Sequence, residues 1–302
     1  MKFLLLSGTV VLTSAAVAGC VVSVDSQGQI VRDEKRFSVK GVPDLRLATF
    51  DGSIDIQSTD REEVVVEIEK RGATKEAVEE LQVLSTQEGN RIDLEVKRPS
   101  SETFSSFGFN RSASARLIVS VPRRSDIVAR TGDGSIRVEG LTGRLEVRTG
   151  DGSIKAIDVS GDLRVKTGDG AVTVDRAEGT LDLDTGDGGV NVTGRLTAVR
   201  LRTGDGSIVY RAEPGTTMTD GWDISTGDGT VSLYLPPDFG AELDAHTGDG
   251  RIANDLTLSP REGSGQVDEE KNRRTVRGRL GSGGKLLRIR TGDGSIRLRQ
   301  GT

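Results

Sequence analysis

A four-residue motif, T-G-D-G, recurs at a fixed interval and constrains the fold of this chain more than any other feature. It occurs eight times, beginning at Thr131, Thr149, Thr167, Thr185, Thr203, Thr226, Thr247 and Thr291. The first five copies are each 18 residues apart, and a degenerate copy begins at Thr49. A fixed period of this length is typical of chains in which one small structural unit is stacked on the next.

Each repeat has the pattern of two short strands joined at a corner. Before one T-G-D-G motif, Leu145 and Val147 alternate with charged residues, and after it Ile154 and Ala156 alternate with polar ones. A period of two predicts strands with one buried face. Thr149 shares the inward parity of Val147. We expect the Gly-Asp-Gly segment to form a tight corner in which glycine supplies a positive φ.

The inward positions also match from one repeat to the next, which favours a stack of coils over an array of hairpins. The expected columns are Leu145-Leu163-Leu181-Val199, Val147-Val165-Leu183-Leu201, Ile136-Ile154-Val172-Val190-Ile208, and Leu141-Val159-Ala177 followed by Leu196. One coil cannot bury its apolar face alone, whereas stacked coils close a continuous core. The sequence therefore predicts an all-β, single-chain parallel β-solenoid (β-helix) with coils of about 18 residues.

The rest of the chain is less regular. Residues 34–128 are predicted to form a β-rich N-terminal part of the solenoid with one short helix, and residues 129–302 the repeat solenoid itself. Residues 256–287 interrupt the repeat and are expected to form an inserted loop or hairpin. The last coil, 286–299, is expected to close the stack, with Arg297 and Arg299 on its open edge discouraging end-to-end association.

The N-terminus reads as a lipoprotein signal. Residues 1–19 combine Lys2 with a short apolar stretch, and Val17-Ala18-Gly19-Cys20 resembles the bacterial lipobox, in which the peptide is cut before the cysteine and the thiol is lipidated. Cys20 is the only cysteine of the chain. Residues 20–33 read as a tether. We therefore expect a lipid-anchored envelope protein, and Val21 after the cysteine favours the outer over the inner membrane.

Composition excludes several classes of protein. The formal net charge of −5 argues against a nucleic-acid partner, which would require a basic footprint. With one His and one Cys in 302 residues, a His/Cys metal site, a disulfide framework and a Cys–His nucleophile are excluded. No cofactor is expected.

The lipobox, the DGSI unit at residues 51–54, the Val121-Pro122 pair and the T-G-D-G-S-I repeats together resemble the bacterial "putative adhesin" family, whose domain has no assigned function. The resemblance covers about residues 37–298 and rests on repeat texture. It implies a secreted or lipid-anchored β-solenoid.

The corner aspartates are the first candidate site. They are Asp133, Asp151, Asp169, Asp187, Asp205, Asp228, Asp249 and Asp293. In a stack they would be about 4.8 Å apart, so their mutual repulsion must be offset. Turn amides and neighbouring basic residues, among them Arg148, Lys166 and Arg202, would make the column structural. Calcium bridging is the alternative, because hard oxygen ligands suit that ion.

Two aromatic groups are candidate contact patches. Phe104, Phe107 and Phe109 lie in a Ser/Gly-rich loop, where they either cap the core or form an exposed patch. Tyr210, Trp222 and Tyr234 lie where the coils lengthen, and a binding face there is a second hypothesis.

The main functional prediction is a non-enzymatic, adhesin-like module that contacts the membrane through its lipid and binds an envelope protein or surface glycan. The alternative is a polysaccharide-active β-helix enzyme, a lyase or hydrolase, because such folds place carboxylates and a basic residue on one face. The ligand and the oligomeric state stay open.

Overall fold

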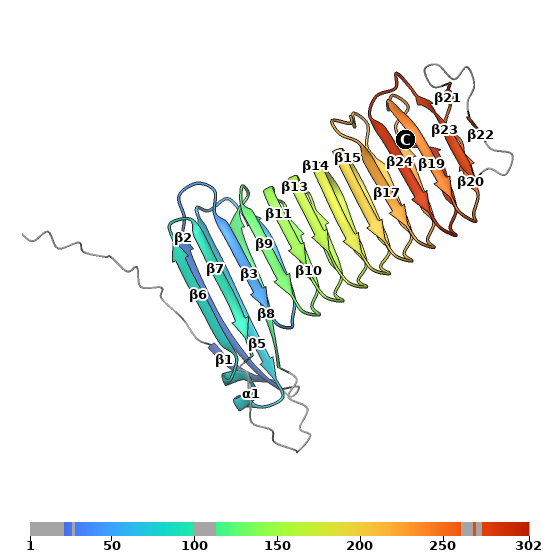
Figure 1. The fold of residues 1–302 in the computed structure, drawn as a ribbon. Helices are drawn as coiled ribbons and strands as arrows, with labels where there is room; N and C mark the ends of the chain where they lie inside the picture. The colour runs from blue at the N-terminus through green and yellow to red at the C-terminus, as the bar shows by residue number, and fades with distance from the viewer. Residues whose placement is uncertain (1–20, 26–27, 99–112, 261–267, 270–273, 302) are drawn as a thin grey trace, which may run out of the picture.

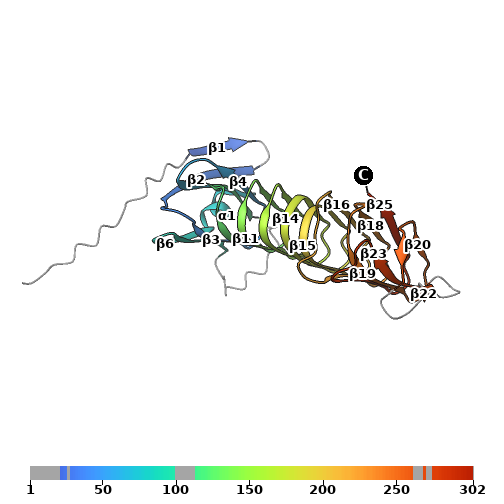
Figure 2. The same ribbon diagram turned by 90° about the horizontal axis from the view of Figure 1, so that it is seen from above.

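The computed structural model describes residues 21–25, 28–98, 113–260, 268–269 and 274–301. These residues form an elongated stack of strands (Figures 1 and 2). All 25 strands belong to one sheet, and the described part holds one short helix. The prediction of an all-β protein is therefore confirmed. No helix within these ranges is long and apolar enough to cross a membrane.

The N-terminal third supplies eight strands and the helix. They are β1 (Val21–Asp25), β2 (Gly28–Ser38), β3 (Asp44–Thr49), β4 (Ile54–Thr59), β5 (Glu63–Gly72), α1 (Lys75–Glu79), β6 (Gln82–Glu88), β7 (Arg91–Lys97) and β8 (Ala113–Pro122). The one predicted helix is present, and Thr74 is its N-cap: the Thr74 hydroxyl accepts a hydrogen bond of 3.2 Å from the Ala77 amide.

The centre and the C-terminal third supply the remaining strands. The central ones are β9 (Asp126–Thr131), β10 (Ile136–Glu139), β11 (Thr142–Arg148), β12 (Ile154–Ile157), β13 (Ser160–Lys166), β14 (Val172–Thr185), β15 (Val190–Thr203), β16 (Ile208–Ala212), β17 (Trp222–Thr226) and β18 (Val231–Leu235). The C-terminal ones are β19 (Ala241–Thr247), β20 (Ile252–Asn254), β21 (Leu258–Ser259), β22 (Asp268–Glu269), β23 (Thr275–Leu280), β24 (Leu286–Thr291) and β25 (Ile296–Gln300).

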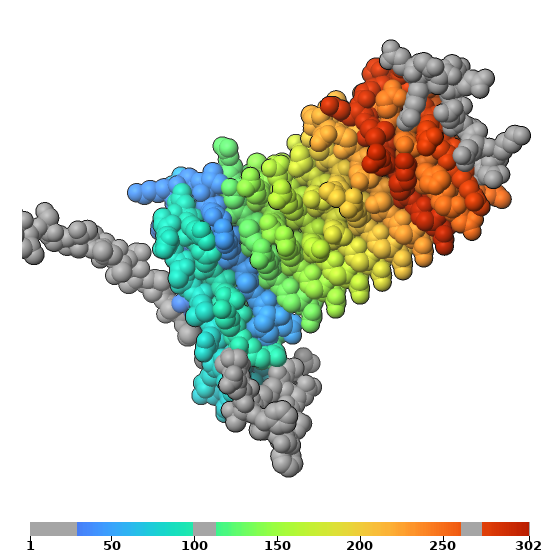
Figure 3. Space-filling view, in the orientation of Figure 1, coloured from blue at the N-terminus to red at the C-terminus, as the bar shows by residue number. Residues whose placement is uncertain are grey.

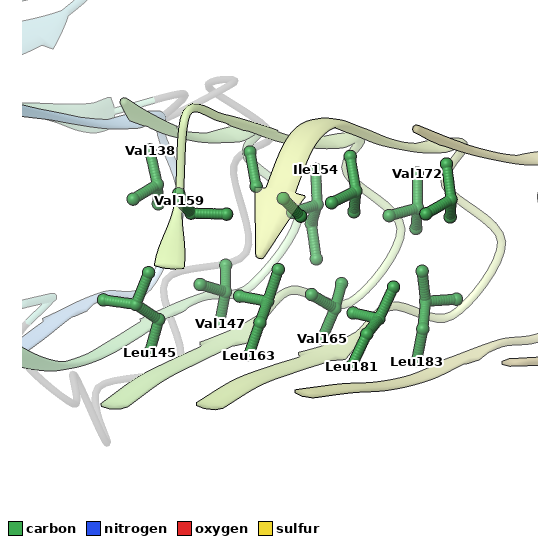
Figure 4. Close-up of a cluster of buried hydrophobic side chains, with 14 of the residues drawn as sticks. Val138, Leu145, Val147, Ile154, Val159, Leu163, Val165, Val172, Leu181 and Leu183 are labelled. Atoms are coloured by element: carbon green, nitrogen blue, oxygen red, sulfur yellow. The ribbon is translucent and has the colours of Figure 1, made fainter. Parts of the chain in front are cut away.

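The central coils pair in parallel at the predicted offset. Leu145 lies beside Leu163, and Leu163 beside Leu181, each 18 residues further along the chain. The side chains of all four predicted columns are buried. Leu196 is the buried residue that continues the Leu141-Val159-Ala177 column, because the register between β14 and β15 shifts there. Figure 4 shows labelled side chains of these columns pointing toward one another from opposite walls. Burial of one such Val or Leu side chain contributes about 1.5–3 kcal/mol.

The glycines of the T-G-D-G corners are required by close packing between coils. A Cβ at Gly152 would lie 2.1 Å from the carbonyl oxygen of Gly134 in the preceding coil. None of the glycines in the eight motifs has a positive φ, so that prediction is wrong. Positive φ occurs instead at other corners of the coils, as at Gly143, Gly161 and Gly179.

The threonine of the motif joins each coil to the one before it. The Thr149 hydroxyl is positioned to donate to the carbonyl oxygens of Gly132 and Gly134, at 3.1 and 2.8 Å. The same pair of contacts recurs at Thr167, Thr185, Thr203, Thr226, Thr247 and Thr291. These threonines are buried, as their parity predicted. The motif is thus a hydrogen-bonded contact between coils.

At the N-terminal end the stacking order differs from the chain order. The coil made by β3 and β4 lies between the later coil of β7 and β8 and that of β9 and β10. Antiparallel strands follow on the outside, because β5 pairs with β8, β2 with β5, β1 with β2 and β6 with β7. The sheet is therefore mixed and the parallel prediction holds only for the coils. The predicted tether at residues 20–33 is also wrong where it is described, since β1 and β2 occupy it.

At the C-terminal end, too, the stacking order differs from the chain order. The last coil, β24 and β25, is inserted between the coil of β17 and β18 and that of β19 and β20. It does not form the open end, so the expectation for Arg297 and Arg299 is wrong. Residues 256–287 supply β21, β22 and β23, and β23 pairs antiparallel with β19 at the end of the stack (Figure 1).

Candidate functional site: a charged wall with an open hollow

One wall of the stack carries an ordered array of outward charges. This charged wall consists of the outward side chains of β9, β11, β13, β17, β24, β19, β23 and the C-terminal halves of β14 and β15, and it faces the viewer in Figures 1 and 3. One outward column alternates in sign in stacking order: Glu146, Arg164, Asp182, Arg200, Asp223, Arg288, Asp244 and Arg277. Opposite charges on directly opposed positions stabilise a sheet by about 0.2–1 kcal/mol per pair.

The neighbouring outward column is mainly basic. In stacking order it is Arg130, Arg148, Lys166, Asp184, Arg202, Ser225, Arg290 and His246. Over β9 to β15 the two columns together hold six basic side chains against three acidic ones. The middle of the wall is therefore positive in a chain whose net charge is −5.

A shallow hollow lies on this positive part of the wall. It has a volume of about 210 Å³, and buried Val165 lies among its lining residues. Its charged lining residues, which define the charged hollow, are Arg148, Arg164, Lys166, Asp182, Asp184, Arg200 and Arg202. All seven are exposed. The hollow is thus open to a ligand that approaches from solvent.

Part of the hollow is held by ion pairs. Lys166 pairs with Asp184 at 3.4 Å, and Arg148 pairs with Glu146, just outside the hollow, at 3.1 Å. All four side chains belong to the exposed or half-exposed wall, where such a pair contributes about 0–1 kcal/mol. These contacts position the side chains and leave them accessible.

The centre of the hollow is unpaired. Arg164 and Arg200 lie on the strands directly on either side of Asp182. None of the three forms an ion pair within 4.0 Å with another side chain in the described part of the chain. Two guanidinium groups and one carboxylate therefore keep their hydrogen-bonding capacity for solvent or for a ligand.

A cluster of the same composition at the C-terminal end is closed. Asp244 on β19 pairs with Arg290 at 2.9 Å and with Arg277 at 3.1 Å. Burial acts to raise the pKa of Asp244, but hydrogen bonds from the two arginines outweigh it and hold that pKa below its ordinary value. The side chain of Asp244 is only 17% exposed. We call this the closed cluster.

The eight predicted corner aspartates lie together along one edge, and every one is exposed. Asp249 pairs with Arg274 at 2.7 Å, and the other seven form no ion pair with a described side chain. No group of three or more His, Cys, Asp or Glu residues within the described ranges could hold a metal ion. Calcium bridging by this column stays an untested prediction.

The aromatic contact patch is wrong for two of its three residues. Tyr210 and Trp222 are fully buried, with ring centroids 5.2 Å apart, and Trp222 packs on Phe239 at 5.1 Å. These aromatic side chains fill the interior of the longer coils. Tyr234 is half-buried on the opposite wall, with the Arg211 guanidinium 4.8 Å from its ring centre.

The remaining predicted sites, Cys20, Phe104, Phe107 and Phe109, lie outside the described residues. The charged hollow itself was not predicted from the sequence. Three of its basic residues, Arg148, Lys166 and Arg202, were interpreted only as counter-charges for the corner aspartates, and Arg164 and Arg200 were not singled out. The 18-residue period would have revealed it, because the outward positions of successive repeats align as the inward ones do.

The stacked β coils and the exposed charged wall define a class of repetitive all-β scaffolds. Residues 42–299 match the Toastrack DUF4097 family, and the chain belongs to it. The resemblance to the adhesin-like domain of unassigned function is thereby confirmed. Among curated proteins, none matches the chain.

Several solved structures are similar to the chain at low identity. A "putative cell adhesion protein" from Clostridium sporogenes is 12% identical, with 89% of this chain and 99% of that chain covered and a TM-score of 0.31. A "putative adhesin" from Bacteroides fragilis is 12% identical, with 88% and 96% covered and a TM-score of 0.39. A "putative lipid binding protein" from Parabacteroides distasonis is 12% identical, with 88% and 96% covered and a TM-score of 0.47.

Proposed function

We propose that this chain is a non-enzymatic, adhesin-like protein of the bacterial cell envelope that binds its partner through the charged wall. The observation that carries the proposal is the unpaired centre of the charged hollow. Arg164, Asp182 and Arg200 are held side by side on three paired strands, yet none is bound to a neighbouring charge. A rigid strand fixes their spacing, which suits recognition of a partner.

The rest of the molecule acts in this proposal as a rod, a β-solenoid that presents the wall. Each coil is joined to the next by backbone pairing and by the buried threonine. The outward side chains of the wall are therefore spaced at about 4.8 Å along the rod, the distance between paired strands. Such a surface binds a repetitive or extended partner better than a small molecule.

The four carboxyl groups with displaced pKa values in the described part of the chain do not have the property of a general acid. The pKa values of Glu69, Glu76, Asp158 and Asp244 all lie below their ordinary range. Each of these carboxyls is therefore held in its ionised form, whereas the general acid of a glycosidase requires a raised pKa. The polysaccharide-active alternative gains no support from these groups.

The proposal includes the lipid anchor at Cys20 and an outer-membrane location. The lipobox at Val17-Ala18-Gly19-Cys20 supports the anchor, and Val21 after the cysteine supports the location. Anchoring would hold the rod at a membrane surface and leave its wall free for the partner. Incorporation of an alkyne-labelled fatty acid in the wild type, and its loss in Cys20→Ser, tests this part directly.

Site-specific crosslinking in the native host tests the binding face. A photo-reactive residue is placed at Thr180, which lies on the charged wall two positions before Asp182 on β14, and in a second strain at Thr173 on the opposite wall, as the control. We expect a discrete crosslinked species from position 180 that is lost when Arg164 and Arg200 are both changed to Gln. Equal crosslinking from both walls, or a species that survives the double substitution, would contradict the proposal.

A further inference from the structure

The geometry points to an acidic polysaccharide, a chain of sugars that bear carboxylate groups, as the ligand of the charged hollow. This inference rests on the proposed function and names the chemistry of the partner. It depends on three features of the hollow: unpaired cations at a fixed separation, an unpaired carboxylate between them, and an acidic edge beside the wall.

The two unpaired guanidinium groups indicate which anionic groups the ligand must carry. Arg164 and Arg200 are two strands apart, which separates their backbones by about 9–10 Å. Guanidinium groups bind carboxylates through two parallel hydrogen bonds. A polymer with carboxylates at regular intervals can engage both arginines at once, and a second binding event on the same chain gains from its high effective concentration.

The carboxylate between the two arginines indicates which uncharged groups the ligand must carry. Asp182 lies between the two arginines, and Asp184 lies next to it on the same strand. An ionised carboxylate only accepts hydrogen bonds, so the ligand must offer donors at this place. Sugar hydroxyl groups are such donors. A ligand that carried only anionic groups would be repelled by Asp182.

The adjoining edge argues against nucleic acid. The corner aspartates follow the wall directly, three residues after its basic column, as Asp169 follows Lys166. All eight are exposed along one edge. A nucleic-acid backbone carries one charge per about 1.7 Å of duplex axis and would meet this edge. A polysaccharide with one charge per sugar has a lower charge density and is repelled less by this edge.

Binding of polygalacturonate to the purified full-length chain tests the inference, with neutral dextran as the control polymer. We expect polygalacturonate to bind and dextran not to bind. Arg164→Gln combined with Arg200→Gln should weaken binding by about tenfold or more, since two charge-assisted contacts are lost. The matched control is Lys155→Gln combined with Arg297→Gln, which removes two exposed charges from the opposite wall and should leave binding unchanged. A thermal melt confirms that both variants fold.

Asp182→Ala separates sugar recognition from simple attraction of charge. If Asp182 accepts hydrogen bonds from hydroxyl groups, the substitution weakens polygalacturonate binding although it removes a negative charge. Stronger binding in Asp182→Ala, or equal losses in the two double variants, would overturn the inference.

Two further outcomes distinguish this inference from the proposed function. If phosphatidylglycerol vesicles or RNA bind through Arg164 and Arg200 while polygalacturonate does not, the sugar assignment is wrong and the binding face stands. If no polyanion binds, and the crosslink from position 180 also fails to depend on the two arginines, both are wrong.

Discussion

The molecule contains two clusters of two arginines around one aspartate, and they differ in a way that separates structure from function. At the C-terminal end, Asp244 is bonded to Arg290 and Arg277 and is largely buried. In the middle of the stack, Arg164 and Arg200 lie beside Asp182 without pairing. The closed cluster joins β19, β23 and β24 at the end of the stack, whereas the open one lies on the regular coils of β13, β14 and β15. The comparison teaches that the same three kinds of side chain can be paired with one another or left exposed, and we assign stability to the paired cluster and binding to the open one.

The largest expected effect comes from the regularity of the central coils, on which the open cluster depends. A Cβ at Gly188 would lie 2.0 Å from the carbonyl oxygen of Gly170, while the nearest atom to a Cβ at Gly189 is 3.9 Å away. We expect Gly188→Ala to lower the free energy of unfolding by about 3 kcal/mol or more, because the coils must separate. Gly189→Ala, the adjacent control, should change it by about 0.5 kcal/mol or less. Equal effects in urea unfolding would show that coil spacing is not the constraint.

Substitution of the two aspartates compares the clusters directly. Asp244→Asn leaves Arg290 and Arg277 without their shared carboxylate in a largely buried place. We expect a loss of about 2 kcal/mol in unfolding free energy. Asp182→Asn should change it by about 0.5 kcal/mol or less, because Asp182 is exposed and unpaired. A larger loss from Asp182→Asn would contradict the assignment of the closed cluster as the structural one.

The threonine contacts of the regular coils give a smaller effect. Thr167 is buried and positioned to donate to two carbonyl oxygens of the preceding coil, at 3.2 and 2.9 Å. Thr167→Val keeps the shape of the side chain and removes the donor, so we expect a loss of about 1 kcal/mol. Thr173→Val on the outer face of the opposite wall is the control and should be near neutral. If both variants unfold at the same denaturant concentration as the wild type, the hydroxyl column is not a stabilising contact.

The smallest predicted effect is the part of the pH dependence of stability that the closed cluster contributes. The pKa of Asp244 is lowered in the folded chain, so its contribution is fully present above the unfolded pKa of about 3.9. It is lost as the pH falls from there through the folded pKa. The unfolding free energy should therefore fall less between pH 7 and pH 3 in Asp244→Asn than in the wild type. A curve for Asp244→Asn that falls as steeply as that of the wild type would contradict this contribution.

The sequence predicted the regular part of the fold because the repeat period is preserved there. Leu145, Leu163 and Leu181 occupy one inward column at the expected spacing, and their burial follows from parity alone. The ends could not be predicted in this way. The last coil is inserted between two earlier ones, which brings Arg288 between Asp223 and Asp244. The charges along this outward column therefore alternate in sign in the stack, although they do not alternate in chain order. Such a contact depends on tertiary pairing, and no local pattern records it.

The misassigned site residues have a similar explanation. Trp222 and Tyr210 were interpreted as a contact patch from their position in longer coils, although both share inward parity with neighbouring buried residues, Ile224 and Ile208. The charged hollow was missed because it is built from four strands, and residues opposite each other on neighbouring strands are 18 positions apart in the chain. Only alignment of the outward positions brings them together.

The most direct measurement of the central claim pairs binding with stability in two matched double variants. Arg164→Gln combined with Arg200→Gln removes no ion pair from the fold, whereas Arg277→Gln combined with Arg290→Gln removes both partners of Asp244. We predict that the first variant loses the crosslink from position 180 and keeps its melting temperature. The second should keep the crosslink at low temperature and melt earlier. The reverse pattern, or loss of stability in both variants, would show that the charged hollow is a structural cluster and not a binding site.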